Sequence, residues 1–231
     1  KGGRFPSAKH GGFSTDGNTN FDFSNLVSGD GSTVCSKKGI KTGGSVEISG
    51  GSVDISSADD CINARTDIVI NDGALSLSSG DDAIHADKNM FINGGDISVA
   101  ASYTAVEGMN IEINGGTVDI TSYYDGIAVA GGNGAAVNKG QNNTADRNIG
   151  ISGGVVTIDA GGDGIDSTGT ASITGGIVSV FSANNSNFGA VVYSDSFVLS
   201  GGVLAAFGSA EKTMAPTLVA GPCISVCAEI S

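Results

Sequence analysis

The chain has 231 residues, of which 38 are glycine and 15% are charged, and its formal net charge at pH 7 is −13. The lack of a Gly-X-Y period excludes collagen, and the lack of biased tracts argues against a disordered chain. No apolar run is long enough to cross a bilayer, and an acidic chain is a poor partner for nucleic acid, because phosphate binding needs cations. Such a chain attracts cations instead, and calcium prefers carboxylate oxygen.

Residues 1–33 are rich in glycine, serine, asparagine and aspartate and show no period. We therefore expect an irregular N-terminal cap in this segment. Because the chain begins at Lys1 without an apolar leader, we expect a mature form from which a targeting segment has been removed.

Residues 34–208 carry an internal repeat of about 22 residues. Its first apolar column advances in steps of 22, 22, 22, 21, 38 and 26 and consists of Ile40, Ile62, Ile84, Val106, Ile127, Ile165 and Val191. A second column keeps a similar rhythm and consists of Val46, Ile68, Met90, Ile111, Ile149, Ala171 and Phe197. A glycine-rich turn also recurs in every unit, from Gly50-Gly51 to Gly201-Gly202.

Within a unit, apolar and polar residues alternate in short runs such as Val46-Glu47-Ile48, which indicates strands of three to five residues. Three such strands per unit predict an all-β fold, a right-handed parallel β-helix of about seven coils with a core of stacked isoleucine and valine. The recurring glycines are explained as tight corners that need a positive φ or the absence of a Cβ.

Two further segments lie outside the regular repeat. The step of 38 predicts a polar, turn-rich inserted loop at about residues 131–147. Residues 209–231 are expected to form a C-terminal cap, because the open end of a stack exposes unpaired strand edges.

The cysteines do not form a recognisable framework. They contain no CxxC pair and are too sparse for a disulfide scaffold. We expect buried thiols that behave as small apolar residues, while a disulfide is left open, for Cys35, Cys61, Cys223 and Cys227.

Acidic residues gather beside the first apolar column. Two positions before the column residue, Asp60 is expected to stack on Asp82 in the next coil, and Asp125 on Asp163. Like charges opposite one another across strands destabilise a sheet. A compensating group is therefore required, either a nearby base, a raised carboxyl pKa or a bound cation.

We expect one or more calcium ions on this acidic strand, because oxygen ligands from turns suit a cation with six to eight ligands. Besides backbone carbonyls and water, the expected ligands are the carboxylates of Asp60, Asp82, Glu107, Asp125 and Asp163. The alternative is that these aspartates cap the corner by accepting hydrogen bonds from backbone amides.

Tyr103 and Tyr124 occupy the same position in neighbouring coils. Beside an acidic strand they suit a sugar-stacking platform, because a pyranose ring has an apolar face, although they could equally cover a corner of the core. Further candidates for ligand binding on the neighbouring outer face are Asn63, Arg65 and His85.

The segments Asp81–Asp87, Tyr103–Gly108 and Gly162–Ser167, with Met214-Ala215-Pro216 after the last coil, resemble the bacterial family of secreted carbohydrate-binding domain-containing β-helix proteins. The resemblance covers about residues 35–220. It implies a pectate-lyase-like shape, a location outside the cell or on its surface, bound calcium, and binding of cellulose or of acidic sugars such as polygalacturonate. It places acidic turn positions at Asp82, Glu107, Asp125, Asp163 and Asp166.

The chain departs from the family pattern at Lys38, Thr104 and Ala128, and calcium is less expected at those places. Because protein and acidic sugar polymer both carry carboxylates, we expect calcium to bridge them. Chelation should then abolish binding of such a polymer.

Two other functions stay open. A calcium-dependent polysaccharide lyase needs a base near the cation, and the basic residues expected near the acidic face, Arg65, Lys88 and Arg147, form no clustered pair. Whether the protein is an enzyme is therefore undecided, and no catalytic residue is assigned. A structural, adhesin-like surface rod would suit the low aromatic content of 6%.

Overall fold

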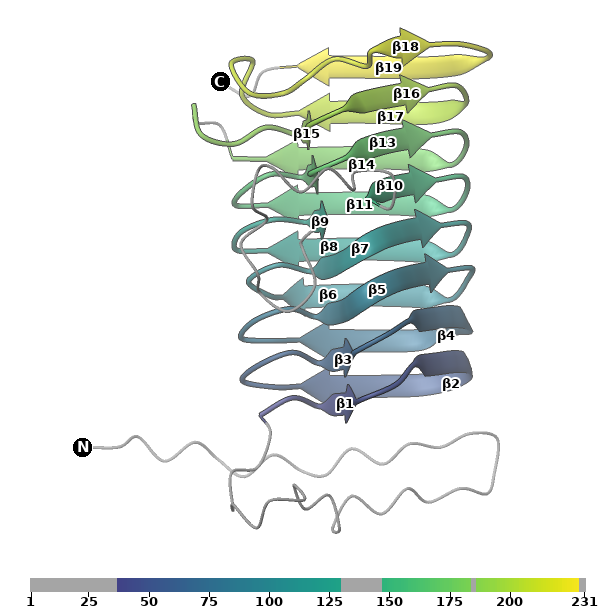
Figure 1. The fold of residues 1–231 in the computed structure, drawn as a ribbon. Coiled ribbons are helices and arrows are strands. Elements are labelled where there is room, and N and C mark those ends of the chain that lie inside the picture. The colour runs from purple at the N-terminus through teal and green to yellow at the C-terminus, as the bar shows by residue number, and fades with distance from the viewer. Residues whose placement is uncertain (1–36, 130–146, 184–185, 229–231) are drawn as a thin grey trace, which may run out of the picture.

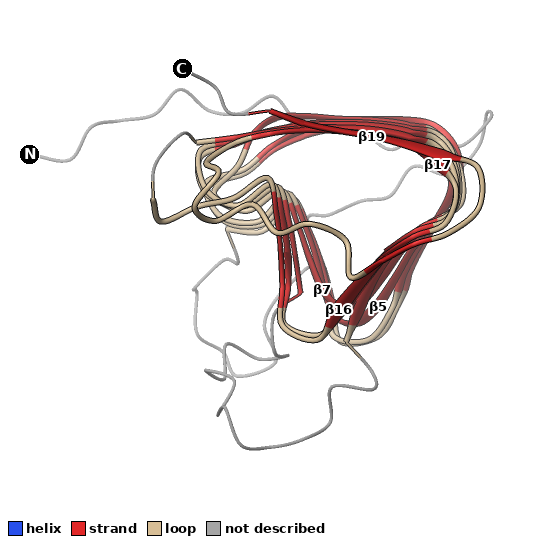
Figure 2. Ribbon diagram, turned by 90° about the horizontal axis from the view of Figure 1, so that it is seen from above, coloured by secondary structure: helices blue, strands red, loops and turns tan. Residues whose placement is uncertain are grey.

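The computed structural model describes residues 37–129, 147–183 and 186–228. In these residues the chain is all-β, with 19 strands and parallel pairing between successive coils. Figure 1 shows the strands stacked coil upon coil, and Figure 2 shows that equivalent strands superimpose when the stack is seen along its axis. The predicted parallel β-solenoid of about seven turns, with about 22 residues per turn, is therefore confirmed.

Three strand positions recur in each coil. The first is formed by β1 (Ile40–Thr42), β3 (Ile62–Ala64), the starts of β5 (Ile84–Ile92) and β7 (Val106–Ile113), β9 (Ile127–Val129), β12 (Ile165–Ser167) and β15 (Val191–Tyr193). The second is formed by the starts of β2 (Val46–Ser56) and β4 (Ile68–Ser78), the ends of β5 and β7, β10 (Asn148–Ile151), β13 (Thr170–Ile173), β16 (Ser196–Leu199) and β18 (Leu218–Val219). The third is formed by the ends of β2 and β4, then β6 (Asp96–Ala101), β8 (Thr117–Ser122), β11 (Val155–Ala160), β14 (Ile177–Ser182), β17 (Gly202–Phe207) and β19 (Cys223–Ala228).

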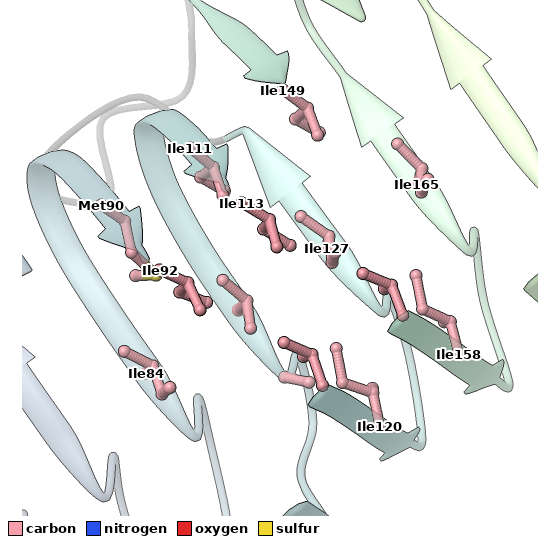
Figure 3. Packing of buried hydrophobic residues seen from close by; sticks show 14 of the residues in the cluster. Ile84, Met90, Ile92, Ile111, Ile113, Ile120, Ile127, Ile149, Ile158 and Ile165 are labelled. Atoms are coloured by element: carbon pink, nitrogen blue, oxygen red, sulfur yellow. The ribbon is translucent and has the colours of Figure 1, made fainter. Parts of the chain in front are cut away.

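Both predicted apolar columns are in register. Ile62 pairs with Ile40 and Ile84, and Ile165 pairs with Ile127 and Val191, so the first column is continuous. We number coils 1 to 7 by its members, from Ile40 to Val191. Figure 3 shows the isoleucines of neighbouring coils packed against one another in the interior, and Ile62 and Ile127 are fully buried.

The corner before the third strand explains part of the glycine content. Gly116 has a φ of +82°, in the left-handed region that side chains with a Cβ rarely adopt. A Cβ there would also lie 2.5 Å from the carbonyl oxygen of Gly95, one coil below. Coil stacking and backbone conformation thus both require glycine at this corner.

Of the segments outside the regular repeat, the structure describes the C-terminal one up to residue 228. The chain after residue 208, expected as a cap, contributes β18 and β19, which pair in parallel with β16 and β17 and extend the solenoid. The expected N-terminal cap at 1–33 and nearly all of the expected loop at 131–147 lie outside the described residues. No helix among the described residues is long and apolar enough to cross a membrane.

Cys61 is a buried free thiol, as expected, and burial raises its pKa. The side chains of Cys35, Cys223 and Cys227 lie outside the described part of the structure.

Candidate functional site

A strip of polar side chains runs up one corner of the solenoid, beside the first strand position. We call it the corner strip. It consists of the residues two before and one after each first-column residue in coils 2 to 6, which are Asp60, Asn63, Asp82, His85, Thr104, Glu107, Asp125, Ala128, Asp163 and Asp166. The positions after the column are in register as predicted, with Asn63 paired to His85 and His85 to Glu107. The positions before it are buried in coils 2 to 5, Asp60 being 2% and Asp125 7% exposed, whereas Asp163 in coil 6 is half-buried.

The two rows of the strip bond to each other within a coil. In coil 2, Nδ2 of Asn63 donates to Oδ2 of Asp60 at 2.6 Å. In coil 3, Nδ1 of His85 lies 2.9 Å from Oδ2 of Asp82. The buried carboxylate therefore points toward the outer row and not into the apolar core.

Coil 1 supplies a cation to the strip. Nζ of Lys38 donates to Oδ1 of Asp59 at 2.9 Å and also to Oδ2 of Asp60. The Lys38 hydrogen bond lowers the pKa of Asp59. Oδ1 of Asp60 is buried and has no hydrogen-bond partner in the described structure.

His85 lies between three carboxylates. Its Nδ1 is 2.9 Å from Asp82 and 3.4 Å from Oε1 of Glu107, and its Nε2 is 3.1 Å from Oδ1 of Asp87. Burial alone would lower the pKa of His85, but the hydrogen bond with Asp82 and the charge of Glu107 raise it to about 9. His85 is therefore an imidazolium at neutral pH.

Glu107 and Asp82 are themselves perturbed. Burial, reinforced by the charge of Asp82, raises the pKa of Glu107 to about 7 despite the neighbouring His85. Burial also raises the pKa of Asp82. The repulsion predicted for this ladder is thus relieved by Lys38, by His85 and by raised carboxyl pKa values.

These side chains surround a pocket in coils 1 to 3. It has a volume of about 270 Å³ and mixed charge. We call it the lower pocket, and it is lined by Lys38, Lys41, Asp60, Asn63, Arg65, Asp81, Asp82, His85 and Asp87.

In coils 5 and 6 the carboxylates of Asp125 and Asp163 bond backbone amides and not basic side chains. Oδ1 of Asp125 accepts a hydrogen bond from the backbone N–H of Asp163 at 2.8 Å, and Oδ1 of Asp163 accepts one from Gly189 at 2.6 Å. This is the corner-capping role considered as the alternative to metal binding. Burial raises the pKa of Asp125 to about 7 and that of Asp166 to about 6.

Aromatic side chains lie beside the corner strip in coils 4 and 5, beyond the lower pocket of coils 1 to 3. Tyr103 and Tyr124 stack with ring centroids 5.0 Å apart and an interplanar angle of 10°. Tyr123 is tilted against Tyr103 at 6.3 Å, and Phe188 meets Tyr124 edge-on at 5.4 Å. With Tyr103 45% and Tyr123 79% exposed, this aromatic cluster lies at the surface and does not simply cover the core.

The predicted site residues lie in or beside the corner strip, but they do not converge on a single site. The lower pocket collects Asp60, Asn63, Arg65, Asp82 and His85, and Glu107 contacts His85 from coil 4. The aromatic pair and the carboxylates of coils 5 and 6 lie farther along. The prediction missed Lys38, Lys41, Asp81, Asp87 and Tyr123. The sequence marked Lys38 only as a departure from the acidic pattern, although it occupies the same coil position as Asp60 and reaches that carboxylate.

Calcium fits the two acidic regions differently. Donor atoms of Asp59, Asp60 and Asp81 lie within 4.8 Å of one another, but the Lys38 ammonium already bonds two of these carboxylates. A divalent ion does not fit there unless Lys38 is displaced. In coils 5 and 6, no three donor atoms of the described residues lie within 4.8 Å of one another, and Asp125 and Asp163 accept hydrogen bonds from backbone amides, so the geometry there provides no ready-made calcium site.

The fold and the corner strip define the class of protein, a parallel β-solenoid with polar and aromatic side chains along one corner. The family model described as carbohydrate-binding domain-containing protein matches residues 7–83 and 81–212. The match covers most of the chain, which therefore belongs to this family, whose name indicates a carbohydrate partner. No curated protein and no solved structure matches the chain.

Proposed function

We propose that this protein binds polysaccharide along the corner strip. The observation that carries the proposal is the exposed aromatic cluster, in which Tyr103 and Tyr124 stack and Tyr123 is largely exposed. Aromatic rings present apolar surface to the C–H face of a sugar, while carboxylates beside them accept hydrogen bonds from its hydroxyl groups. Glu107, one position after the column residue in the coil that carries Tyr103, supplies such an acceptor.

Calcium belongs to the same proposal. In coils 5 and 6 the ion would be held by single carboxylates, with most ligands from water and from the polysaccharide, because the donor atoms of Asp125, Asp163 and Asp166 do not converge on one point. When bound, it supplies positive charge that joins carboxylates of the protein to those of an acidic sugar. Polygalacturonate-like polymers and cellulose are the proposed ligands, and a secreted or cell-surface location accords with polymers that lie outside cells.

The test is binding of soluble pectin, xylan and cellulose oligomers, measured by calorimetry with calcium and with a chelator. Replacing both exposed tyrosines, Tyr103→Ala with Tyr123→Ala, should raise the dissociation constant about tenfold or more, equivalent to about 1.4 kcal/mol. Phe181→Ala removes a 39% exposed ring from another strand position and should leave binding unchanged. Wild-type protein that binds none of these sugars would disprove the proposal and favour a structural rod.

A further inference from the structure

The lower pocket contains more cationic groups than the acidic composition of the chain suggests. Four of its nine lining residues carry a positive charge at neutral pH, given the protonated state of His85. They are Lys38, Lys41, Arg65 and His85.

Two of these cations form ion pairs with carboxylates of the protein. Lys38 bonds Asp59 and Asp60, and its side chain is only 17% exposed. His85 bonds Asp82 and Asp87, and its side chain is 14% exposed. Four carboxylates of the lower coils therefore have a cation built into the fold, and this region does not require a metal ion for neutralisation.

The other two cations, Lys41 and Arg65, are exposed and form no ion pair with any described carboxylate. Lys41 in β1 is in register with Asn63 in β3. Arg65 follows Asn63 by two residues, directly after β3, and both basic residues line the same pocket. A guanidinium fork beside an ammonium suits a carboxylate, which arginine can bind through two parallel hydrogen bonds.

We propose that the lower pocket is a calcium-independent subsite for the carboxylate of an acidic sugar residue, held by Lys41 and Arg65. This inference rests on the proposed polysaccharide binding and identifies the chemistry at one end of the strip. Asp81 and Asp87, on the same lining, accept hydrogen bonds from the hydroxyl groups of that residue. An acidic polymer then needs no calcium bridge at coils 1 to 3, contrary to the expectation from net charge alone.

The experiment measures binding of a short oligogalacturonate by calorimetry, in excess chelator and in millimolar calcium. Wild-type protein should bind in chelator, and the affinity should fall with added salt because the contact is ionic. The double variant Lys41→Ser with Arg65→Ser should lose at least tenfold in affinity in chelator. Lys88→Ser removes one charge from an exposed lysine outside the pocket and should bind within about twofold of wild type.

Each outcome of this experiment either supports or overturns the proposed carboxylate subsite. Binding that appears only with calcium would overturn the subsite while leaving polysaccharide binding intact. Binding in chelator that the double variant retains in full would place the carboxylate elsewhere and would also overturn it. Wild-type protein that binds oligogalacturonate in neither solution would also overturn the subsite, whereas the proposed function fails only if the other polysaccharides are not bound either. A melting temperature of the double variant equal to that of wild type shows that the fold is unaffected.

Discussion

The ammonium of Lys38 in coil 1 bonds the buried carboxylate of Asp60 in coil 2, so a charge in one coil is neutralised by the neighbouring coil. Lys38→Met should lower the free energy of unfolding by about 3 kcal/mol, because it leaves a buried charge without its partner. Urea denaturation measures the effect. Lys37→Met, an exposed neighbour, is the control and should change stability by less than about 0.5 kcal/mol.

The thermal stability of the Lys38→Met variant should also depend on calcium. Donor atoms of Asp59, Asp60 and Asp81 remain within 4.8 Å of one another once the ammonium is gone, and a divalent ion can then take its place. Millimolar calcium should raise the melting temperature of the variant more than that of wild type. Equal shifts would mean that Lys38 does not exclude a cation from this cluster.

Stability should fall as the pH rises from about 5 to 9. The pKa of His85 is raised to about 9, so its stabilising contribution is complete below its unfolded value near 6.5 and is lost as pH rises through 9. The pKa of Glu107 is raised to about 7, so its ionisation begins to cost stability above about 4.5. Both groups bind more protons in the folded state and act in the same direction.

Urea denaturation at a series of pH values checks this slope. Glu107→Gln should make the curve less steep between about pH 5 and 7, where the raised pKa values of Asp125 and Asp166 still contribute to the slope. A wild-type stability that rises over the same interval would contradict the assignment of protons to the corner strip.

Replacing a first-column residue should cost much more than replacing an exposed apolar residue. Ile127 is fully buried and pairs with Val106 and Ile165, so Ile127→Ala should destabilise the protein by about 2–5 kcal/mol. Ile177 is 50% exposed on β14, and Ile177→Ala should cost less than about 1 kcal/mol. Similar losses for the two variants would show that the column is not the main source of stability.

Gly116→Ala should destabilise the fold by about 1–3 kcal/mol, because it forces a Cβ into a backbone conformation with positive φ. The added Cβ would also clash with the carbonyl of Gly95. Gly43→Ala is the matched control, since no atom lies within 4 Å of its Cβ position, and it should be neutral or slightly stabilising. Thermal melting of the two variants makes the comparison.

The solenoid could be predicted from sequence because its rule is local and repeated. The steps between Ile40, Ile62 and Ile84 fix which coils are neighbours, and parallel stacking then fixes the register. Ile127 and Ile165 pair although the step between them exceeds one coil, so the extra residues lie between them, and the loop that they form stays a prediction. Handedness stays a prediction from the general preference of parallel crossovers.

The site was harder to predict because the corner breaks the alternation of a strand. Asp60 has the same parity as Ile62, which would point it inward, yet it bonds Lys38 and Asn63 at the outer edge. Tyr123 precedes the aligned column of Tyr103 and Tyr124, so column alignment did not reveal it. Calcium at the acidic strand and the predicted roles of individual ligands stay predictions.

The parallel stacking has a consequence for any polymer that binds here. Successive coils are about 4.8 Å apart, so the corner strip, from coil 2 to coil 6, extends for about 20 Å along the axis. An extended sugar chain lying parallel to that axis would meet the lower pocket, the aromatic rings and the carboxylates of coils 5 and 6 in a fixed sequence. The protein would then discriminate the direction of the chain as well as its composition, and affinity would increase with the number of sugar units until the strip is filled.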